Sequence, residues 1–137
     1  GDRVLEIFAE SARHSVRASD LLGRLGGEEF AAVLCDTSRE KALVVAERIR
    51  ERFAHATLEV DNRPVCATVS IGLVHCEEAA LDVAELLARA DQALYVAKER
   101  GRNRVEVATL EMMLNQKDGN PAASTPAAER VATKSAA

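Results

Sequence analysis

The chain has 137 residues, 47% of them hydrophobic, and a formal net charge of −4. It is long enough for one hydrophobic core, so we expect a single compact domain. The acidic balance gives no general polyanion-binding surface and argues against nucleic acid as a partner. Because no apolar stretch is long enough to span a bilayer, we expect no membrane contact from this segment. The odd number of cysteines, without metal-ligand spacing, predicts free thiols in a reducing cytoplasm.

The first predicted element is an amphipathic helix over residues 2–16. Its apolar side chains recur at helical spacing, which is typical of a helix packed on a sheet. They are Leu5, Phe8, Ala9, Ala12 and Val16.

A hairpin follows, with predicted strands near residues 21–25 and 29–35. Gly26 and Gly27 lie between them, and a Gly-Gly pair favours a tight turn in which both central residues have positive φ. The second strand is apolar at successive positions, which predicts a central strand covered on both faces.

Two carboxylates, Glu28 and Glu29, come directly after the glycines. Adjacent carboxylates repel each other, and a bound cation offsets that repulsion. Hard oxygen ligands favour Mg²⁺ or a similar ion. The alternative reading is a solvated acidic turn on the surface.

The remaining elements continue the alternation of helices and strands. Thr37 with Glu40 predicts a capping box for a helix to about Phe53. Residues 57–74 predict strands interrupted at 61–64, the longer one running over 65–74. Asp82 predicts the start of a helix to about Arg100, where Gly101 stops it. A short strand over 104–107 completes the order α-ββ-α-β-α-β.

The composition changes after residue 107. The segment 108–137 has almost no large apolar side chains beyond Met113, so burial cannot offset the entropy cost of ordering it. We therefore expect a domain over residues 1–107 and a disordered tail over 108–137, with a short helical extension through Met113.

Five segments, in order and at compatible spacing, resemble the GGDEF family, the diguanylate cyclases. The central one is Gly-Gly-Glu-Glu-Phe over 26–30, with Glu in place of Asp at its third position. The other segments are Gly-Asp-Arg-Val-Leu at 1–5, Arg-Ala-Ser-Asp at 17–20, Thr-Val-Ser-Ile-Gly at 68–72, and Asp91 to Lys98 followed by Gly-Arg-Asn-Arg at 101–104. The resemblance runs from residue 1 to about residue 107.

The resemblance implies an α/β (α+β) fold, in which a mixed sheet of the nucleotidyl cyclase and polymerase palm type is flanked by helices. In the family this domain begins with a strand and a helix that the sequence lacks, and that strand supplies a metal-binding Asp. We therefore expect an N-terminally truncated domain whose sheet would expose unpaired edges. Such a truncated chain would be of doubtful catalytic competence.

The chemistry implied is condensation of two GTP molecules into cyclic di-GMP with release of two pyrophosphates. Glu28 corresponds to the metal ligand and proton acceptor, and Glu29 to a second metal contact for Mg²⁺ or Mn²⁺. Gly26 and Gly27 would leave room for the nucleotide.

Three further residues match nucleotide-binding positions of the family. Asp2 falls on the guanine-recognising Asp, although it could simply cap a helix. Lys98 and Arg102 match a phosphate-binding pair and would share one side of the helix if the helix continued that far. Both could instead be cations that stabilise a helix C-terminus.

Arg17 and Asp20 resemble the family's inhibitory product site, and Arg48 is a candidate third member. Guanidinium groups suit phosphate and guanine edges, so product feedback by cyclic di-GMP is implied. The alternative is a surface ion pair of little energetic value.

Because each protomer would hold one GTP, the enzyme reading implies a homodimer. The alternative function is a non-catalytic module, derived from a cyclase, that binds cyclic di-GMP or GTP. Input domains and any membrane anchor would lie upstream of residue 1, and the segment itself is expected in the cytoplasm.

Overall fold

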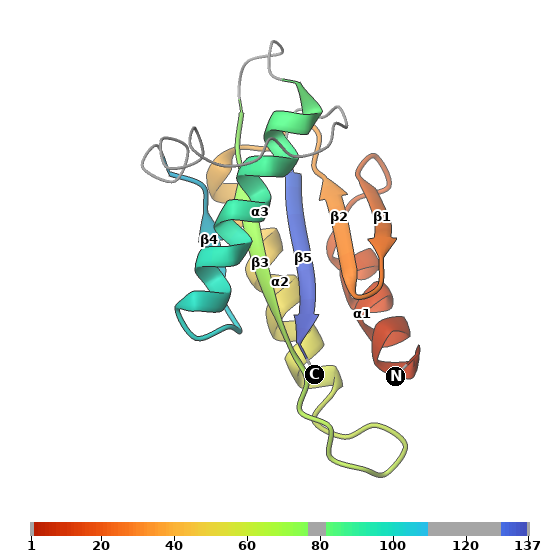
Figure 1. The fold of residues 1–137 in the computed structure, drawn as a ribbon. Helices are drawn as coiled ribbons and strands as arrows, with labels where there is room; N and C mark the ends of the chain where they lie inside the picture. Colours follow the sequence, from red (N-terminus) through yellow and green to blue (C-terminus); the bar gives the residue numbers. More distant parts are fainter. Residues whose placement is uncertain (1, 77–81, 110–129, 137) are drawn as a thin grey trace.

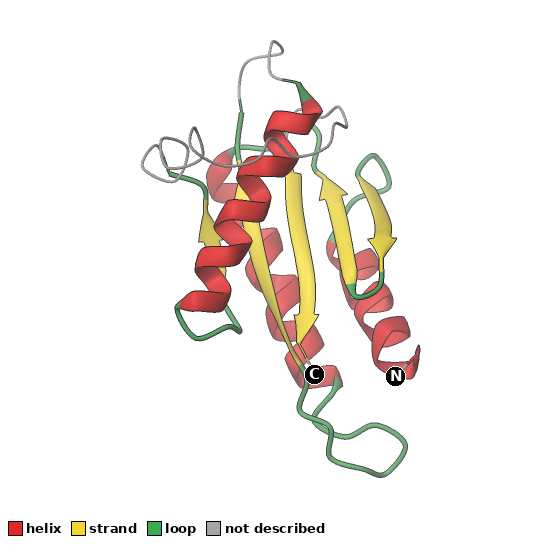
Figure 2. Ribbon diagram, in the orientation of Figure 1, coloured by secondary structure: helices red, strands yellow, loops and turns green. Residues whose placement is uncertain are grey.

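The computed structural model describes residues 2–76, 82–109 and 130–136. These residues form a five-stranded mixed sheet with helices on both faces (Figures 1 and 2). The elements in chain order are α1 (Asp2–Ser15), β1 (Leu21–Gly26), β2 (Glu29–Val33), α2 (Arg39–Ala56), β3 (Thr68–Val74), α3 (Val83–Glu99), β4 (Val105–Val107) and β5 (Arg130–Ala136). The predicted α/β class, a mixed sheet flanked by helices, is confirmed.

The sheet has the strand order β1-β2-β5-β3-β4. β3 and β4 run parallel, whereas the other neighbouring strands are antiparallel. Figure 1 shows α3 crossing one face of the sheet over β3 and β5, with α1 and α2 on the opposite face. No helix in the described ranges is long and apolar enough to cross a bilayer.

The main core lies between the sheet and the α1–α2 layer. Phe8 of α1 is fully buried at its centre, with ring centroids 4.8 Å from Phe30 of β2 and 5.3 Å from Phe53 of α2. Aromatic pairs at these separations add to the stabilisation from burial alone. The predicted helical stripe of α1 therefore faces the core, and it fixes α1 against the hairpin strand that follows the two acids.

The second layer depends on a close approach of α3 to β3. A Cβ built at Gly72 would overlap the backbone of Ala90 and Leu94, so this position has no room for a side chain. Val74 packs with Leu86 and Ala90 on the same face. Since Val74 lies at the end of β3 and contacts the first half of α3, the helix runs back towards the start of the strand.

β5 differs from the expectation for the tail. Residues 130–136 form the central strand, paired with β2 from Glu29↔Lys134 to Val33↔Arg130 and with β3 from Thr68↔Ala136 to Val74↔Arg130. The composition gave no sign of this strand, which pairs through its backbone with a neighbour on each side. β5 also covers the inner edges of β2 and β3 that were expected to be unpaired. The rest of the expected tail beyond Thr109, including the extension through Met113, lies outside the described residues.

The hairpin strands are less buried than predicted. In β2, Phe30 and Ala32 are buried, but Ala31 and Val33 on the other face are partly exposed. The reason is that α3 does not reach over the hairpin (Figure 1). β1 is an edge strand and is mostly exposed.

Two predicted boundaries also shift. Ser38, not Thr37, caps α2 by accepting a hydrogen bond from the Lys41 amide at 3.2 Å. The segment expected to hold two strands contains an isolated bridge between Val60 and Arg63, and β3 starts only at Thr68. The predicted start of α3 at Asp82 is confirmed, and the helix ends with Arg100 as its C-cap, directly before Gly101, as predicted.

Candidate functional site

The hairpin turn places Glu28 at its tip. Gly27 and Glu28 occupy the turn, whereas Gly26 belongs to β1 and pairs with Glu29, the first residue of β2. The prediction that both glycines take the central turn positions is therefore wrong by one residue. The reason is an irregularity in the register between Arg24 and Gly26, which shifts the turn along the chain. Both acids remain together and exposed.

The glycines give this turn an open backbone. Gly26 and Gly27 have φ values of 146° and 52°, a region that favours glycine, and a Cβ at either position would meet nothing within 4 Å. The Arg24 Nε donates a hydrogen bond of 2.9 Å to the carbonyl of Gly27 and so braces the turn. A ligand can approach the main chain here without meeting a side chain.

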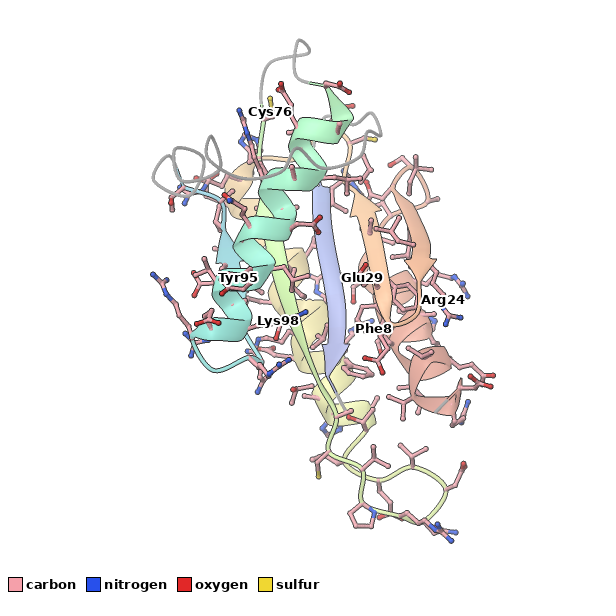
Figure 3. All side chains as sticks on the ribbon, in the orientation of Figure 1. Phe8, Arg24, Glu29, Cys76, Tyr95 and Lys98 are labelled. Carbon is pink, nitrogen blue, oxygen red and sulfur yellow. The ribbon has the colours of Figure 1, made fainter. Side chains whose placement is uncertain are left out.

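The other predicted substrate residues lie at the same end of the sheet as the turn. β2 and β3 both begin there and β5 ends there, because β5 is antiparallel to both. α3 runs back to this end and carries Lys98 in its last turn. Figure 3 shows Lys98 on α3 and Glu29 on β2 on either side of β5. Asp2, in the first turn of α1, lies at this end as well (Figure 1).

Asp2 lies beside the hairpin, as its predicted role requires. It lines a cavity of about 540 Å³ between α1 and the hairpin, together with Arg13, Gly23, Arg24 and Phe30. Glu28 and Glu29 do not line this cavity. The structure therefore places Asp2 beside the hairpin, whereas Glu28 and Glu29 are exposed to solvent outside this cavity.

Lys98 and Arg102 do not share a helical face, because α3 ends at Glu99. The Gly101 amide donates to the Lys98 carbonyl at 3.4 Å, and the Arg102 amide donates to the Ala97 carbonyl at 2.9 Å. This pair of bonds is the Schellman ending of a helix. Arg102 follows it with a φ of 63° and is exposed, so the loop and not the helix decides where its guanidinium lies.

The two hairpin acids fit a Mg²⁺ ion as a partial ligand set. Mg²⁺ commonly takes one or two carboxylates and completes its shell with water and substrate phosphates. Within the described ranges, no group of three His, Cys, Asp or Glu side chains is placed to hold a metal. Glu28 and Glu29 would therefore bind the ion together with a nucleotide.

The three residues of the predicted product site meet in a second cavity. Arg17, Asp20 and Arg48 line a space of about 390 Å³ with Thr37, Lys41 and others, between the end of α1 and the first half of α2. Its apolar lining consists of Leu34, Val44 and Val45. Its charged lining combines the three cations with the carboxylates Asp20, Asp36 and Glu40. Guanidinium and ammonium groups beside apolar side chains suit a ligand with phosphates and flat bases.

Asp20 and Arg17 have different surroundings in this cavity. The Asp20 side chain is only 3% exposed and accepts hydrogen bonds from the Arg17 amide at 2.8 Å and the Cys35 amide at 3.2 Å. The Arg17 side chain is 60% exposed, and its Nη2 donates to the Cys35 carbonyl and to the Thr37 hydroxyl. The carboxylate therefore shapes the turn, while the guanidinium keeps an open face.

Sequence reasoning missed Thr37 and Lys41 as members of this cavity. Thr37 was assigned to the cap of α2, but its hydroxyl accepts from Arg17, which lies twenty residues earlier. No local pattern signals a contact over that separation. The two candidate sites lie at opposite ends of the hairpin, since Arg17 and Asp20 precede β1 while Glu28 lies in the turn.

Comparison with known proteins gives one consistent result. Residues 1–104 match the family model described as "Diguanylate cyclase, GGDEF domain". The chain is 44% identical over 109 residues to the probable diguanylate cyclase DgcT of Escherichia coli, a match that covers 78% of the chain and 24% of the relative. The chain thus spans about a quarter of the length of this curated relative.

Solved structures agree with this result. The active GGEEF domain of a diguanylate cyclase from Vibrio cholerae is 36% identical with a TM-score of 0.69, covering 79% of this chain and 68% of that one. The GGDEF domain of DgcB from Caulobacter crescentus in complex with c-di-GMP is 29% identical with a TM-score of 0.71, covering 78% of this chain and 64% of that one. Fold, motifs and relatives together assign the chain to the GGDEF family of diguanylate cyclases.

Proposed function

We propose that the chain is a diguanylate cyclase domain that condenses two GTP molecules into cyclic di-GMP. The observation that supports this most strongly is the open glycine turn that carries Glu28 and Glu29 at the same end of the sheet as Asp2 and Lys98. An acid pair, a cavity of about 540 Å³ and cationic side chains in one region suit a nucleoside triphosphate with its metal ion.

Each half-reaction is an in-line displacement at phosphorus. The ribose 3′ oxygen of one GTP bonds to the α-phosphorus of the other, and the bond from that phosphorus to pyrophosphate breaks. The 3′ hydroxyl proton passes to the Glu28 carboxylate, and two such steps close the ring and release two pyrophosphates. The protein mainly has to position the groups and neutralise charge.

We assign the remaining roles by chemistry. The Asp2 carboxylate accepts hydrogen bonds from guanine N–H groups in the cavity beside the hairpin. Lys98 and Arg102 neutralise phosphate charge, and Gly26 with Gly27 leaves room for the nucleotide. Glu28 and Glu29 would hold Mg²⁺ or Mn²⁺ together with the phosphates, and the bound ion would favour loss of the hydroxyl proton and stabilise charge on the phosphates.

The reaction needs two protomers in this proposal. Each chain presents one hairpin turn and so one GTP, and two copies must bring their substrates face to face. The chain acts as a homodimer in the cytoplasm, a compartment in which its three free cysteines stay reduced.

Product feedback is the regulatory part of the proposal. Arg17 and Arg48 bind phosphate or guanine edges of cyclic di-GMP in the 390 Å³ cavity. Asp20 fixes the turn that carries Arg17, because its carboxylate accepts hydrogen bonds from the amides of Arg17 and Cys35.

A second candidate is a non-catalytic module that binds cyclic di-GMP. The observation in its favour is that all three predicted product-binding residues line one cavity. In this case the chain binds cyclic di-GMP without making it.

The experiment compares the chain with its Glu28→Ala variant, each incubated with GTP and Mg²⁺, and separates the nucleotides by chromatography. The cyclase proposal expects cyclic di-GMP from the unmodified chain only. Calorimetry with cyclic di-GMP is run on the same samples. Binding without synthesis would select the non-catalytic module, and neither binding nor synthesis would reject both candidates.

A further inference from the structure

The loop after α3 has an unusual backbone. Gly101, Arg102 and Asn103 have consecutive positive φ values of 116°, 63° and 46°. Glycine adopts this region freely and asparagine tolerates it, but arginine rarely does. This conformation therefore requires contacts that hold the loop in place.

Backbone hydrogen bonds fix the two ends of this loop. The Arg102 amide is bonded to the Ala97 carbonyl at 2.9 Å, and the Ile71 amide is bonded to the Arg104 carbonyl at 2.9 Å where β4 joins β3. Between these two points, the Asn103 side chain accepts a hydrogen bond from a helix distant in sequence.

That side chain is Arg50 of α2. Its Nη1 donates to the Asn103 Oδ1 at 2.9 Å, across 53 positions of sequence. Its Nε and Nη2 both lie 2.9 Å from the Glu47 Oε2, and the side chain is only 21% exposed. A guanidinium is planar and rigid. Because Glu47 holds the edge that carries Nε and Nη2, the Nη1 group points in a fixed direction.

We propose that Arg50 is a positioning residue that, through Asn103, holds the adjacent Arg102 in place to meet substrate phosphate. The inference rests on the proposed function, because it assumes that Arg102 contacts GTP. Arg50 itself does not touch the substrate. It restricts the loop, so that Arg102 does not have to be ordered each time a nucleotide binds.

The test uses the full chain and the Arg50→Met variant, which keeps the length of the side chain and removes its donors. Without this contact Arg102 has to be ordered when GTP binds, and ordering one long side chain costs roughly two- to tenfold in affinity, so the KM for GTP should rise by up to about tenfold. The kcat should change less than about twofold, because the chemistry at Glu28 is untouched. Arg52→Met, an exposed position two residues further along α2, is the matched control and should leave both constants unchanged.

A double-mutant cycle separates positioning from general damage. In an Arg102→Ala background, adding Arg50→Met should change the KM by less than about twofold, because the residue that it positions is gone. The Arg50→Lys variant should restore part of the affinity, since an ammonium reaches either Asn103 or Glu47 but not both. Additive effects, or a fall in kcat with an unchanged KM, would overturn the proposal.

Hydrogen exchange provides a readout without substrate. Arg50→Met should speed exchange of the amides of residues 101–104, and Arg52→Met should not. If the unmodified chain neither binds nor converts GTP, the proposed function fails, and hydrogen exchange alone then tests whether Arg50 holds the loop 101–104. Unchanged exchange in Arg50→Met would overturn this positioning role whatever the chain does with GTP.

Discussion

The two acids of the hairpin turn are neighbours in sequence but differ in position. Glu28 lies in the turn itself, whereas Glu29 begins β2 and is paired in the sheet with Gly26 and Lys134. The residue at the free tip can reach a substrate hydroxyl more readily than one that is fixed in a ladder.

We therefore expect unequal effects from removing the two charges. Glu28→Gln should lower kcat by roughly 10²-fold or more, as the loss of a general base does. Glu29→Gln should have a smaller effect. Thermal unfolding should hardly change for Glu28→Gln, because the side chain is exposed. Steady-state kinetics on both variants check this, and a larger loss for Glu29→Gln would exchange the assigned roles.

Substitutions at Asp20 and Arg17 should affect different properties, the first mainly stability and the second mainly binding of cyclic di-GMP. Asp20→Ala removes the acceptor of the exposed Arg17 amide and of the partly buried Cys35 amide. Leaving the Cys35 amide unpaired costs about 1–3 kcal/mol of unfolding free energy. Arg17→Ala should weaken cyclic di-GMP binding with a smaller loss of stability, since its side chain is mostly exposed. Denaturant titration and calorimetry measure the two quantities, and unchanged affinity in Arg17→Ala would remove it from the product site.

At the scale of residues, the sequence pointed to the types of side chain but not to their partners. Motifs supplied the site candidates Asp2, Glu28, Lys98, Arg17 and Asp20, whose roles stay predictions. Arg50, Thr37 and Lys41 were not, because their contacts join helices and loops far apart in the chain. The exposure of Arg17 against the burial of Asp20 also depends on tertiary packing.

Among the elements, α3 approaches β3 closely at Gly72. Gly72 faces the backbone of Ala90 and Leu94, with no room for a methyl group. Because backbone cannot rotate away as a side chain can, a Cβ here would force α3 off the sheet.

Gly72→Ala should therefore destabilise the fold by about 1–3 kcal/mol or more, as overpacking of a core does. Gly23→Ala, in β1, is the matched control, because a Cβ there would meet nothing within 4 Å. Chemical denaturation of the two variants makes the comparison. Equal stabilities would show that α3 does not lie this close to β3.

The elements were mostly predictable because their signals are local. The apolar stripe of α1, the acid that caps α3 and the glycine that ends α3 all follow from short-range rules. The cap of α2 was misplaced by one residue, because Thr37 and Ser38 are both good caps and a tertiary contact with Arg17 decided between them.

For the whole molecule, the main surprise is the central strand β5. Its sequence is Arg-Val-Ala-Thr-Lys-Ser-Ala, which has little apolar content. Composition predicted disorder, but an interior strand can rely on the unpaired edges of its neighbours. The pairing of β5 depends on the topology of the sheet, which local sequence patterns do not predict.

Deleting residues 110–137 should test the importance of that strand. The deletion exposes the inner edges of β2 and β3, so we expect a lower melting temperature and self-association through those edges. Calorimetry and light scattering follow the two effects. A monomer with unchanged stability would contradict the place of β5 in the sheet.

The measurement that tests the central claim most directly is the stoichiometry of the reaction. The intact chain is incubated with GTP and Mg²⁺ at increasing protein concentration, and cyclic di-GMP and pyrophosphate are quantified together. A cyclase that works as a homodimer should release two pyrophosphates for each cyclic di-GMP, and its specific activity should rise with concentration as protomers pair. Pyrophosphate without cyclic di-GMP, or no product at any concentration, would contradict it.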